Sequence, residues 1–111
     1  MTAPSARCGP AQRSSGDAFE RKAADAAQLL KLLANEHRLL ILCRLAETRE
    51  MSVNGLADAV GLSQSALSQH LARMREDGLL GTRREAQTVY YRLADPNATR
   101  LLALLRDIYC P

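Results

Sequence analysis

The chain has few aromatic residues: no tryptophan, one phenylalanine and three tyrosines among 111 residues. Leucine, alanine, valine and isoleucine must therefore build its core, and a chain of this length supports one domain with a modest interior. No run approaches the roughly 20 apolar residues of a membrane-spanning helix. The N-terminus also lacks the apolar segment of a secretory signal peptide. We therefore expect a cytoplasmic protein without membrane association, in which thiols stay reduced.

A strong charge of one sign is absent too. The net charge is +3 and the pI is about 9.0, a mild basic excess that a homodimer would double and that suits a polyanionic partner. Residues 1–17 combine proline, glycine, serine and alanine without periodicity, which predicts a flexible N-terminal tail. The folded domain is then expected at residues 18–111.

Residues 52–80, SVNGLADAVGLSQSALSQHLARMREDGLL, predict two short helices joined by a tight turn. Ser52 is a candidate N-cap, and Gly61 suits a left-handed exit from the first helix, predicted at residues 53–60. Ser63 would cap the second helix. Its apolar stripe follows the spacing i, i+4, i+7 and consists of Leu67, Leu71 and Met74.

The opposite face of the second helix carries hydroxyls and carboxamides, which can approach base edges in a major groove. The candidate DNA contacts on this helix are Gln64, Ser65, Ser68 and Gln69, with His70 on its flank. For His70, packing or a phosphate contact is the expected role. A polar helix face can also be merely solvated, so this motif needs support from the residues around it.

The following segment, GTRREAQTVYYRLAD, changes to an alternation with a period of two. Two strands are predicted at residues 81–85 and 88–93, with a short polar turn between them. A basic hairpin directly after a recognition helix is a wing, which places cations over DNA phosphates beside the groove. The candidate contacts on it are Arg83, Arg84 and Gln87. The alternative is an ordinary solvated hairpin.

Two further helices are predicted outside this unit, at residues 18–34 and 97–109, and both are rich in alanine or leucine. Asp95 and Pro96 mark the start of the last one, since proline is tolerated in a first helical turn. A body of this size has too little interior to bury both apolar stripes. They are therefore candidates for a dimer surface, although they could also close the core of the monomer.

Residues 29–93 resemble the ArsR-type winged helix-turn-helix repressors, small bacterial dimers that leave DNA when an inducer binds. The matching motifs are LLKLLANEHRLLILCRL, LSQSALSQHLARMREDGLL and VYYRL. The resemblance implies a mainly α fold with a small β-hairpin, the winged helix-turn-helix. It also implies a homodimer that pairs through its first and last helices and binds double-stranded operator DNA.

Many members of that family bind metals, through a Cys-x-Cys pair on the first helix of the motif or through His and Asp ligands on the last helix. Here residues 53–60 contain no cysteine and residues 97–109 contain no histidine. His37 and His70 have no second ligand nearby in the sequence, so packing or capping explains them better. We therefore expect no metal site and no cofactor, and a metal(loid)-responsive repressor is the alternative.

Three cysteines remain to be explained. Cys8 lies in the predicted tail, where an incidental thiol is the simplest interpretation. Cys43 falls on an apolar stripe with Leu39 and Ala46, and could serve as a small core residue. Cys110 follows the last predicted helix, where an exposed thiol has no packing purpose.

One cysteine in the RLLILC helix and another at the end of the last helix resemble the persulfide-responsive (SqrR/BigR-like) branch of the same family. The resemblance implies a dithiol repressor that binds DNA when reduced. A persulfide or polysulfide inducer would release it by forming a (poly)sulfide bridge between Cys43 and Cys110 within one subunit. The attacking thiolate would be helped by partial exposure or by a nearby cation such as Arg38 or Arg44.

Two other functional classes are less consistent with these residues. A winged-helix module for protein–protein interaction would need neither the Ser/Gln helix face nor the wing arginines, and its interface would be more aromatic. An enzyme is not expected, because Cys43 and His37 point about 120° apart on one helix and no carboxylate completes a triad.

Overall fold

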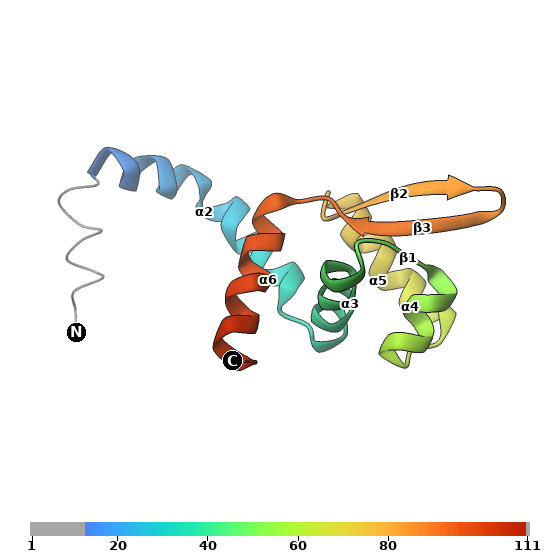
Figure 1. Cartoon of the computed structure of the whole chain (residues 1–111). Helices are drawn as coiled ribbons and strands as arrows, with labels where there is room; N and C mark the ends of the chain where they lie inside the picture. The colour runs from blue at the N-terminus through green and yellow to red at the C-terminus, as the bar shows by residue number, and fades with distance from the viewer. Residues whose placement is uncertain (1–12, 111) are drawn as a thin grey trace. The chain divides into compact units, whose positions relative to one another are not determined.

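The computed structural model describes residues 13–110, with side chains from residue 18 onward. Five helices and a three-stranded antiparallel sheet occur in this part of the chain, which confirms the predicted winged helix-turn-helix fold (Figure 1). The elements are α2 (Arg13–Leu33), α3 (Glu36–Thr48), β1 (Met51–Ser52), α4 (Val53–Val60), α5 (Gln64–Glu76), β2 (Leu80–Glu85), β3 (Thr88–Leu93) and α6 (Pro96–Tyr109).

Helix α2 begins at Arg13, five residues earlier than predicted, and ends at Leu33. The serines and glycine at residues 14–16 are weak helix formers, but each costs at most about 1 kcal/mol relative to alanine, which a long helix can offset. Residues 13–17 are therefore helical, and the rest of the predicted tail, residues 1–12, lies outside the described residues. Along α2 itself, Phe19 and Leu30 are exposed large apolar side chains.

The core of the body lies where α3, α4, α5 and the sheet meet. Its largest fully buried side chains include Ile41, Leu42, Leu45, Leu56, Leu67, Leu71, Met74 and Leu79. Among the described residues no polar or charged residue is buried with them. Aliphatic side chains and Met74 therefore make up the buried core of the helix-turn-helix, as the shortage of aromatic residues predicted.

The two helices of the helix-turn-helix begin and end at residues that cap them through short-range interactions. The Ser52 hydroxyl accepts a hydrogen bond from the Gly55 amide at 3.1 Å, and the Ser63 hydroxyl accepts one from the Ala66 amide at 3.2 Å. Gly61, with φ of 71°, leaves α4 in the left-handed conformation that glycine favours. All three predictions for this turn are confirmed.

The wing consists of β2 and β3, which pair in register from Leu80 opposite Leu93 to Glu85 opposite Thr88. This hairpin extends beyond the helices of the body (Figure 1). A third strand, β1, was not predicted: its two residues pair with β3, and two residues carry no detectable periodicity. Because β1 directly precedes α4, it attaches the base of the wing to the start of the helix-turn-helix.

The last helix, α6, starts at Pro96, one residue before the prediction, and the Asp95 side chain caps it by accepting from the Asn97 amide at 2.9 Å. Leu102 is buried against the body, whereas Leu104 and Ile108 are exposed. No described helix combines the length and the apolar character that a membrane span requires.

Candidate nucleic-acid interface and thiol pocket

Helix α5 presents its predicted face to solvent. Its buried side is held by Leu67, Leu71 and Met74, which are at most 1% exposed. The side chains predicted to face DNA are exposed, namely Gln64, Ser65, Ser68 and Gln69. The structure thus places these four residues on one accessible surface of a helix that is anchored from behind.

The four polar residues differ in how far they are already engaged. The Gln64 amide donates a hydrogen bond to the Asn54 side chain of α4, and the hydroxyls of Ser63 and Ser65 lie 3.4 Å apart. Within residues 18–110, the side chains of Ser68 and Gln69 make no hydrogen bond. Gln64 therefore ties the two helices of the motif together, while Ser68 and Gln69 keep their hydrogen-bonding capacity for a partner.

His70 is half-buried on the flank of α5, and its ring centroid lies 6.0 Å from that of His37 on α3. Burial lowers the pKa of His70, and the positive charge of Arg38 and the neighbouring His37 lower it further. A largely neutral imidazole packed between two helices fits the packing role better than a phosphate contact.

The wing arginines point to different environments, because successive residues of a strand face opposite sides of the sheet. Arg83 contacts the Glu50 carboxylate at 2.6 Å and the Glu85 carboxylate at 2.9 Å. Its guanidinium carbon also lies 4.6 Å from the centroid of the Tyr90 ring. The charge that was expected to face DNA phosphates is thus compensated by two carboxylates.

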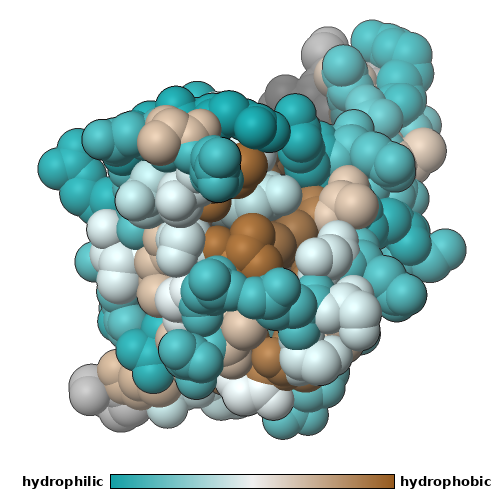
Figure 2. Space-filling model, turned by 90° about the vertical axis from the view of Figure 1, so that its right-hand side faces the viewer, coloured by the Kyte–Doolittle hydropathy of each residue, from teal (hydrophilic) through white to brown (hydrophobic). Residues whose placement is uncertain are grey.

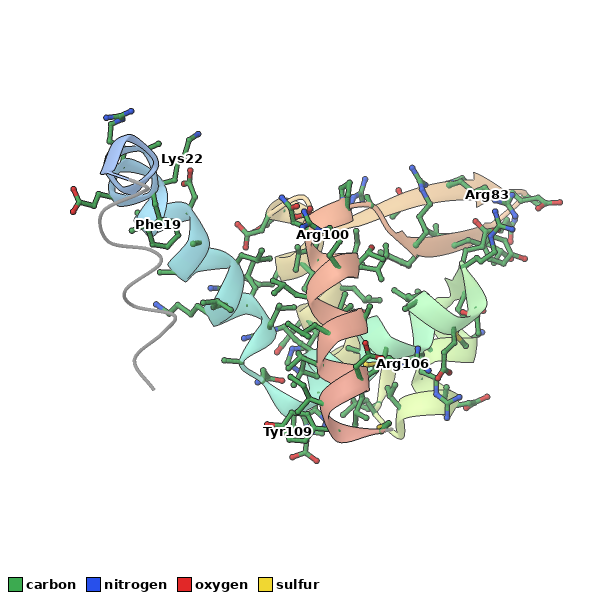
Figure 3. The ribbon with its side chains drawn as sticks, turned by 60° about the vertical axis from the view of Figure 1, so that its left-hand side comes forward. Phe19, Lys22, Arg83, Arg100, Arg106 and Tyr109 are labelled. Carbon is green, nitrogen blue, oxygen red and sulfur yellow. The ribbon has the colours of Figure 1, made fainter. Side chains whose placement is uncertain are left out.

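Arg84 and Gln87 remain at the tip of the wing as exposed side chains, and the described part of the chain records no ion pair for Arg84. Figure 2 views the molecule from the side of the hairpin tip and shows hydrophilic residues around a smaller hydrophobic area. Figure 3 shows Arg83 on the hairpin, away from Arg100 and Arg106, which lie on α6. Among the predicted phosphate contacts, Arg84 has the side chain that is ready to bind an anion.

Cys43 and Cys110, far apart in the sequence, line the same pocket of about 180 Å³ between α3 and the end of α6. Cys43 is half-buried and Cys110 is exposed, and both are free thiols. The other lining residues are mainly apolar, namely Leu39, Leu102, Leu105, Arg106 and Tyr109. Cys8 lies outside the described residues.

The electrostatic environment of Cys43 differs from the expectation. Burial raises the pKa of the Cys43 thiol, Arg106 lowers it, and Glu47 and Cys110 raise it. The predicted cations Arg38 and Arg44 do not take this role. Arg106, itself paired with Glu47 at 3.1 Å, is the cation that acts on the thiol.

The predicted cations are held elsewhere. Arg38 donates from Nε to the Leu32 carbonyl oxygen at 2.6 Å, and Arg44 lies 3.7 Å from Glu47. Residues four apart share a helix face, so the separation of Arg106 and Cys110 could have indicated a cation near that end of the pocket. Its approach to Cys43 depends on the packing of α6 against α3.

In the part of the chain that is described, no three His, Cys, Asp or Glu side chains gather as a metal site requires.

Residues 35–81 match the family described as "Bacterial regulatory protein, arsR family". The transcriptional activator HlyU of Vibrio cholerae serotype O1 is 52% identical over 92 residues, which cover 83% of this chain and 84% of HlyU. The structure of HlyU from Vibrio cholerae N16961 superposes with a TM-score of 0.78 at 51% identity, covering 83% of this chain and 99% of that one.

Two further relatives are similar over much of the chain. The transcriptional repressor BigR from Xylella fastidiosa superposes with a TM-score of 0.79 at 38% identity, covering 86% of this chain and 96% of BigR. The arsenical resistance operon repressor of Escherichia coli (strain K12) is 46% identical over 67 residues, which cover 60% of this chain and 57% of the repressor. These relatives are transcriptional regulators, which are not enzymes, and this confirms the expectation that the chain is not one.

Proposed function

The chain belongs to the arsR family of bacterial regulatory proteins, and from this membership we propose that it is a dithiol-based repressor. The reduced homodimer binds operator DNA, and reactive sulfur species release it by bridging Cys43 and Cys110. The observation that carries this proposal is the shared pocket of the two thiols.

DNA recognition is assigned to α5 and the wing. In a symmetric dimer the two α5 helices enter successive major grooves about 34 Å apart. Ser65, Ser68 and Gln69 face the base edges, and Arg84 and Gln87 lie over the flanking phosphates. Gln69→Ala should therefore weaken binding to the operator more than binding to random duplex, whereas Arg84→Ala should weaken both and reduce the salt dependence.

Dimerisation is assigned to the outer helices. On α6, Leu104, Ile108 and Tyr109 are 54%, 57% and 77% exposed, although apolar side chains of this size gain free energy on burial. Phe19 and Leu30 are comparably exposed along α2. A second copy of the chain is the occupant that matches a family of dimeric regulators.

The bridging reaction follows from ordinary thiol chemistry. The Cys43 thiolate attacks the outer sulfur of an organic persulfide, which leaves a persulfide on Cys43 and releases the carrier as a thiol. Cys110 then attacks the inner sulfur of that group and expels hydrosulfide, so the inducer's sulfane sulfur is reduced while the two cysteines are oxidised. If Cys110 itself carries an extra sulfur, the product is a trisulfide, and each inserted sulfur lengthens the link by about 2 Å.

The pocket accounts for selectivity in this scheme. Burial raises the pKa of Cys43 and so lowers its thiolate fraction, which slows attack on persulfide and on peroxide alike. The apolar lining of the pocket accepts an uncharged sulfur chain readily. A closed bridge would tie α3 to α6, and a coupling of about 1–3 kcal/mol between bridge and operator would change DNA affinity about 5- to 150-fold.

The test is intact-protein mass spectrometry together with operator binding after treatment with an organic persulfide. Wild type should gain an internal link between Cys43 and Cys110 and release DNA, whereas peroxide should act poorly. Cys43→Ser and Cys110→Ser should bind DNA yet ignore the persulfide, and Cys8→Ser should respond as wild type does. Links between subunits would refute the intrasubunit geometry.

A metal(loid)-responsive repressor is the second candidate, supported by the similarity to the arsenical resistance operon repressor. Release of operator DNA by micromolar zinc or arsenite, with persulfide inert, would establish it in place of the dithiol mechanism. A protein-interaction module would be recognised by the absence of a steep salt dependence in duplex binding.

A further inference from the structure

Glu50 lies in the short connection between α3 and β1, where Arg83 contacts its carboxylate and the charges of two further arginines act on it. Arg83 donates to it from Nε at 2.9 Å and from a terminal nitrogen at 2.6 Å, so two guanidinium nitrogens reach the same carboxylate. The hydrogen bond from Arg83 lowers the pKa of Glu50, and the charges of Arg92 and Arg49 lower it further. The Glu50 carboxylate is thus the anion that Arg83 binds at the base of the wing.

The placement of this carboxylate follows from the fold. Arg49 ends α3 with φ of 77°, and the next residues enter β1, whose Ser52 pairs with Tyr90 of β3. Tyr90 is also the register partner of Arg83 on β2. The sheet therefore brings Glu50 beside Arg83 although 33 positions separate them in the sequence.

The hydrogen bonds of 2.9 Å and 2.6 Å both end on Oε1 of Glu50, and Nε of Arg83 also donates to Oε2 at 3.2 Å, so Arg83 reaches both oxygens of the carboxylate as it would reach two oxygens of a phosphate. A guanidinium binds a carboxylate or a phosphate through two parallel N–H donors. Both partners here are substantially exposed, with 46% exposure for the Arg83 side chain and 32% for that of Glu50. Salt screens an exposed ion pair, so a DNA phosphate can compete with Glu50 for Arg83 when a polyanion approaches.

We infer that Glu50 is an intramolecular competitor of DNA phosphate for Arg83 and limits the affinity of the wing for DNA. In the free protein Arg83 is held by Glu50 and Glu85, and Arg84 on the opposite face of β2 makes the phosphate contact. Loss of the Glu50 charge removes one of the two carboxylates that hold Arg83, so that Arg83 can bind a phosphate more readily. The inference rests on the proposed binding of duplex DNA by α5 and the wing.

This arrangement has a use for a repressor that must discriminate its operator. Phosphate contacts carry no base information and strengthen non-specific binding as much as specific binding. A carboxylate that is paired with one wing arginine reduces the affinity for DNA of any sequence and leaves the base contacts of α5 unchanged. Glu50 would therefore raise the ratio of operator binding to random-duplex binding.

The experiment is a double-mutant cycle with Glu50→Gln, Arg83→Gln and the combined variant, measured by fluorescence anisotropy on random duplex and on operator DNA over a range of salt. Glu50→Gln should raise the affinity for random duplex when Arg83 is present and should have no effect in the Arg83→Gln background. Arg83→Gln should reduce the salt slope by about 0.9 per wing in the Glu50→Gln background and by less in wild type.

The matched control is Glu76→Gln, which removes the same charge from the end of α5, where the described residues show no arginine paired with Glu76. An equal gain from Glu76→Gln, or from Glu50→Gln with and without Arg83, would reduce the effect to bulk charge and overturn the inference. Weaker binding by Glu50→Gln would overturn it too, because Glu50 would then hold the wing in its binding position. Failure of wild type itself to bind any duplex would instead refute the proposed function.

Discussion

Replacing Leu104 by alanine tests the proposed dimer surface on α6. Full burial of a leucine side chain contributes about 1.5–3 kcal/mol. Leu104 is 54% exposed in the single chain, so contact with a second copy would supply about half of that contribution, or roughly 0.8–1.6 kcal/mol per subunit. A two-fold axis repeats every contact, and the dimer would then lose about 1.6–3.2 kcal/mol.

A loss of that size weakens the dimer by a factor of about 15 to 200. Sedimentation equilibrium over a range of protein concentrations measures the dissociation constant directly, and operator binding should become more dependent on protein concentration in parallel. The monomer itself should be little destabilised, because substitution of an exposed side chain leaves no cavity in the core.

Val60→Ala provides the control, since Val60 is a half-buried aliphatic residue on α4, which belongs to the helix-turn-helix. It should leave the dimer dissociation constant unchanged. If Leu104→Ala also leaves that constant unchanged, or if both variants change it equally, α6 does not supply the interface through this face.

Glu47→Gln should move the pH midpoint of Cys43 alkylation to lower pH, and Arg106→Gln should move it to higher pH. The reason is that Glu47 raises and Arg106 lowers the pKa of a thiol that burial already raises. The midpoints can be measured by pH-dependent iodoacetamide kinetics, and two shifts of the same sign would refute the prediction. Ser63→Ala removes the hydroxyl that accepts from the first turn of α5 and should cost about 1 kcal/mol of stability, seen as a fall of about 4–8 °C in Tm; an unchanged Tm would contradict a capping role. Ala86→Gly should stabilise the protein by about 0.5–1 kcal/mol, because Ala86 has φ of 57° in the wing turn and glycine adopts that conformation without strain. A lower midpoint of urea unfolding, with an unchanged dependence of the unfolding free energy on urea concentration, would argue against it.

The helix-turn-helix could be predicted in detail because its boundaries depend on neighbouring residues. A serine that caps a helix bonds to an amide three residues away, and a glycine that ends a helix needs only its own φ. The wing register likewise follows from a two-residue turn between two alternating strands. Ser52, Gly61 and Ser63 accordingly have the roles that were predicted for them.

The predictions failed where the signal was short or the contact was distant. Strand β1 has two residues and exists because β3 offers its free edge. The start of α2 was placed too late because serine and glycine only weaken a helix. The cation that acts on Cys43 was not found, because the sequence suggested its neighbours Arg38 and Arg44, whereas Arg106 reaches it from another helix.

The sequence by itself determined the local chemistry of this protein: where the helices of the motif begin and end, which face of α5 is polar, and which strands form the wing. Its resemblance to a family indicated which two thiols to compare. Only the tertiary structure decided what surrounds each charged or reactive group. The reason is that the burial of a group and its electrostatic interactions depend on which residues lie near it in space, whatever their separation along the chain. It placed both thiols in one apolar pocket and gave Arg83 a carboxylate partner across the sheet.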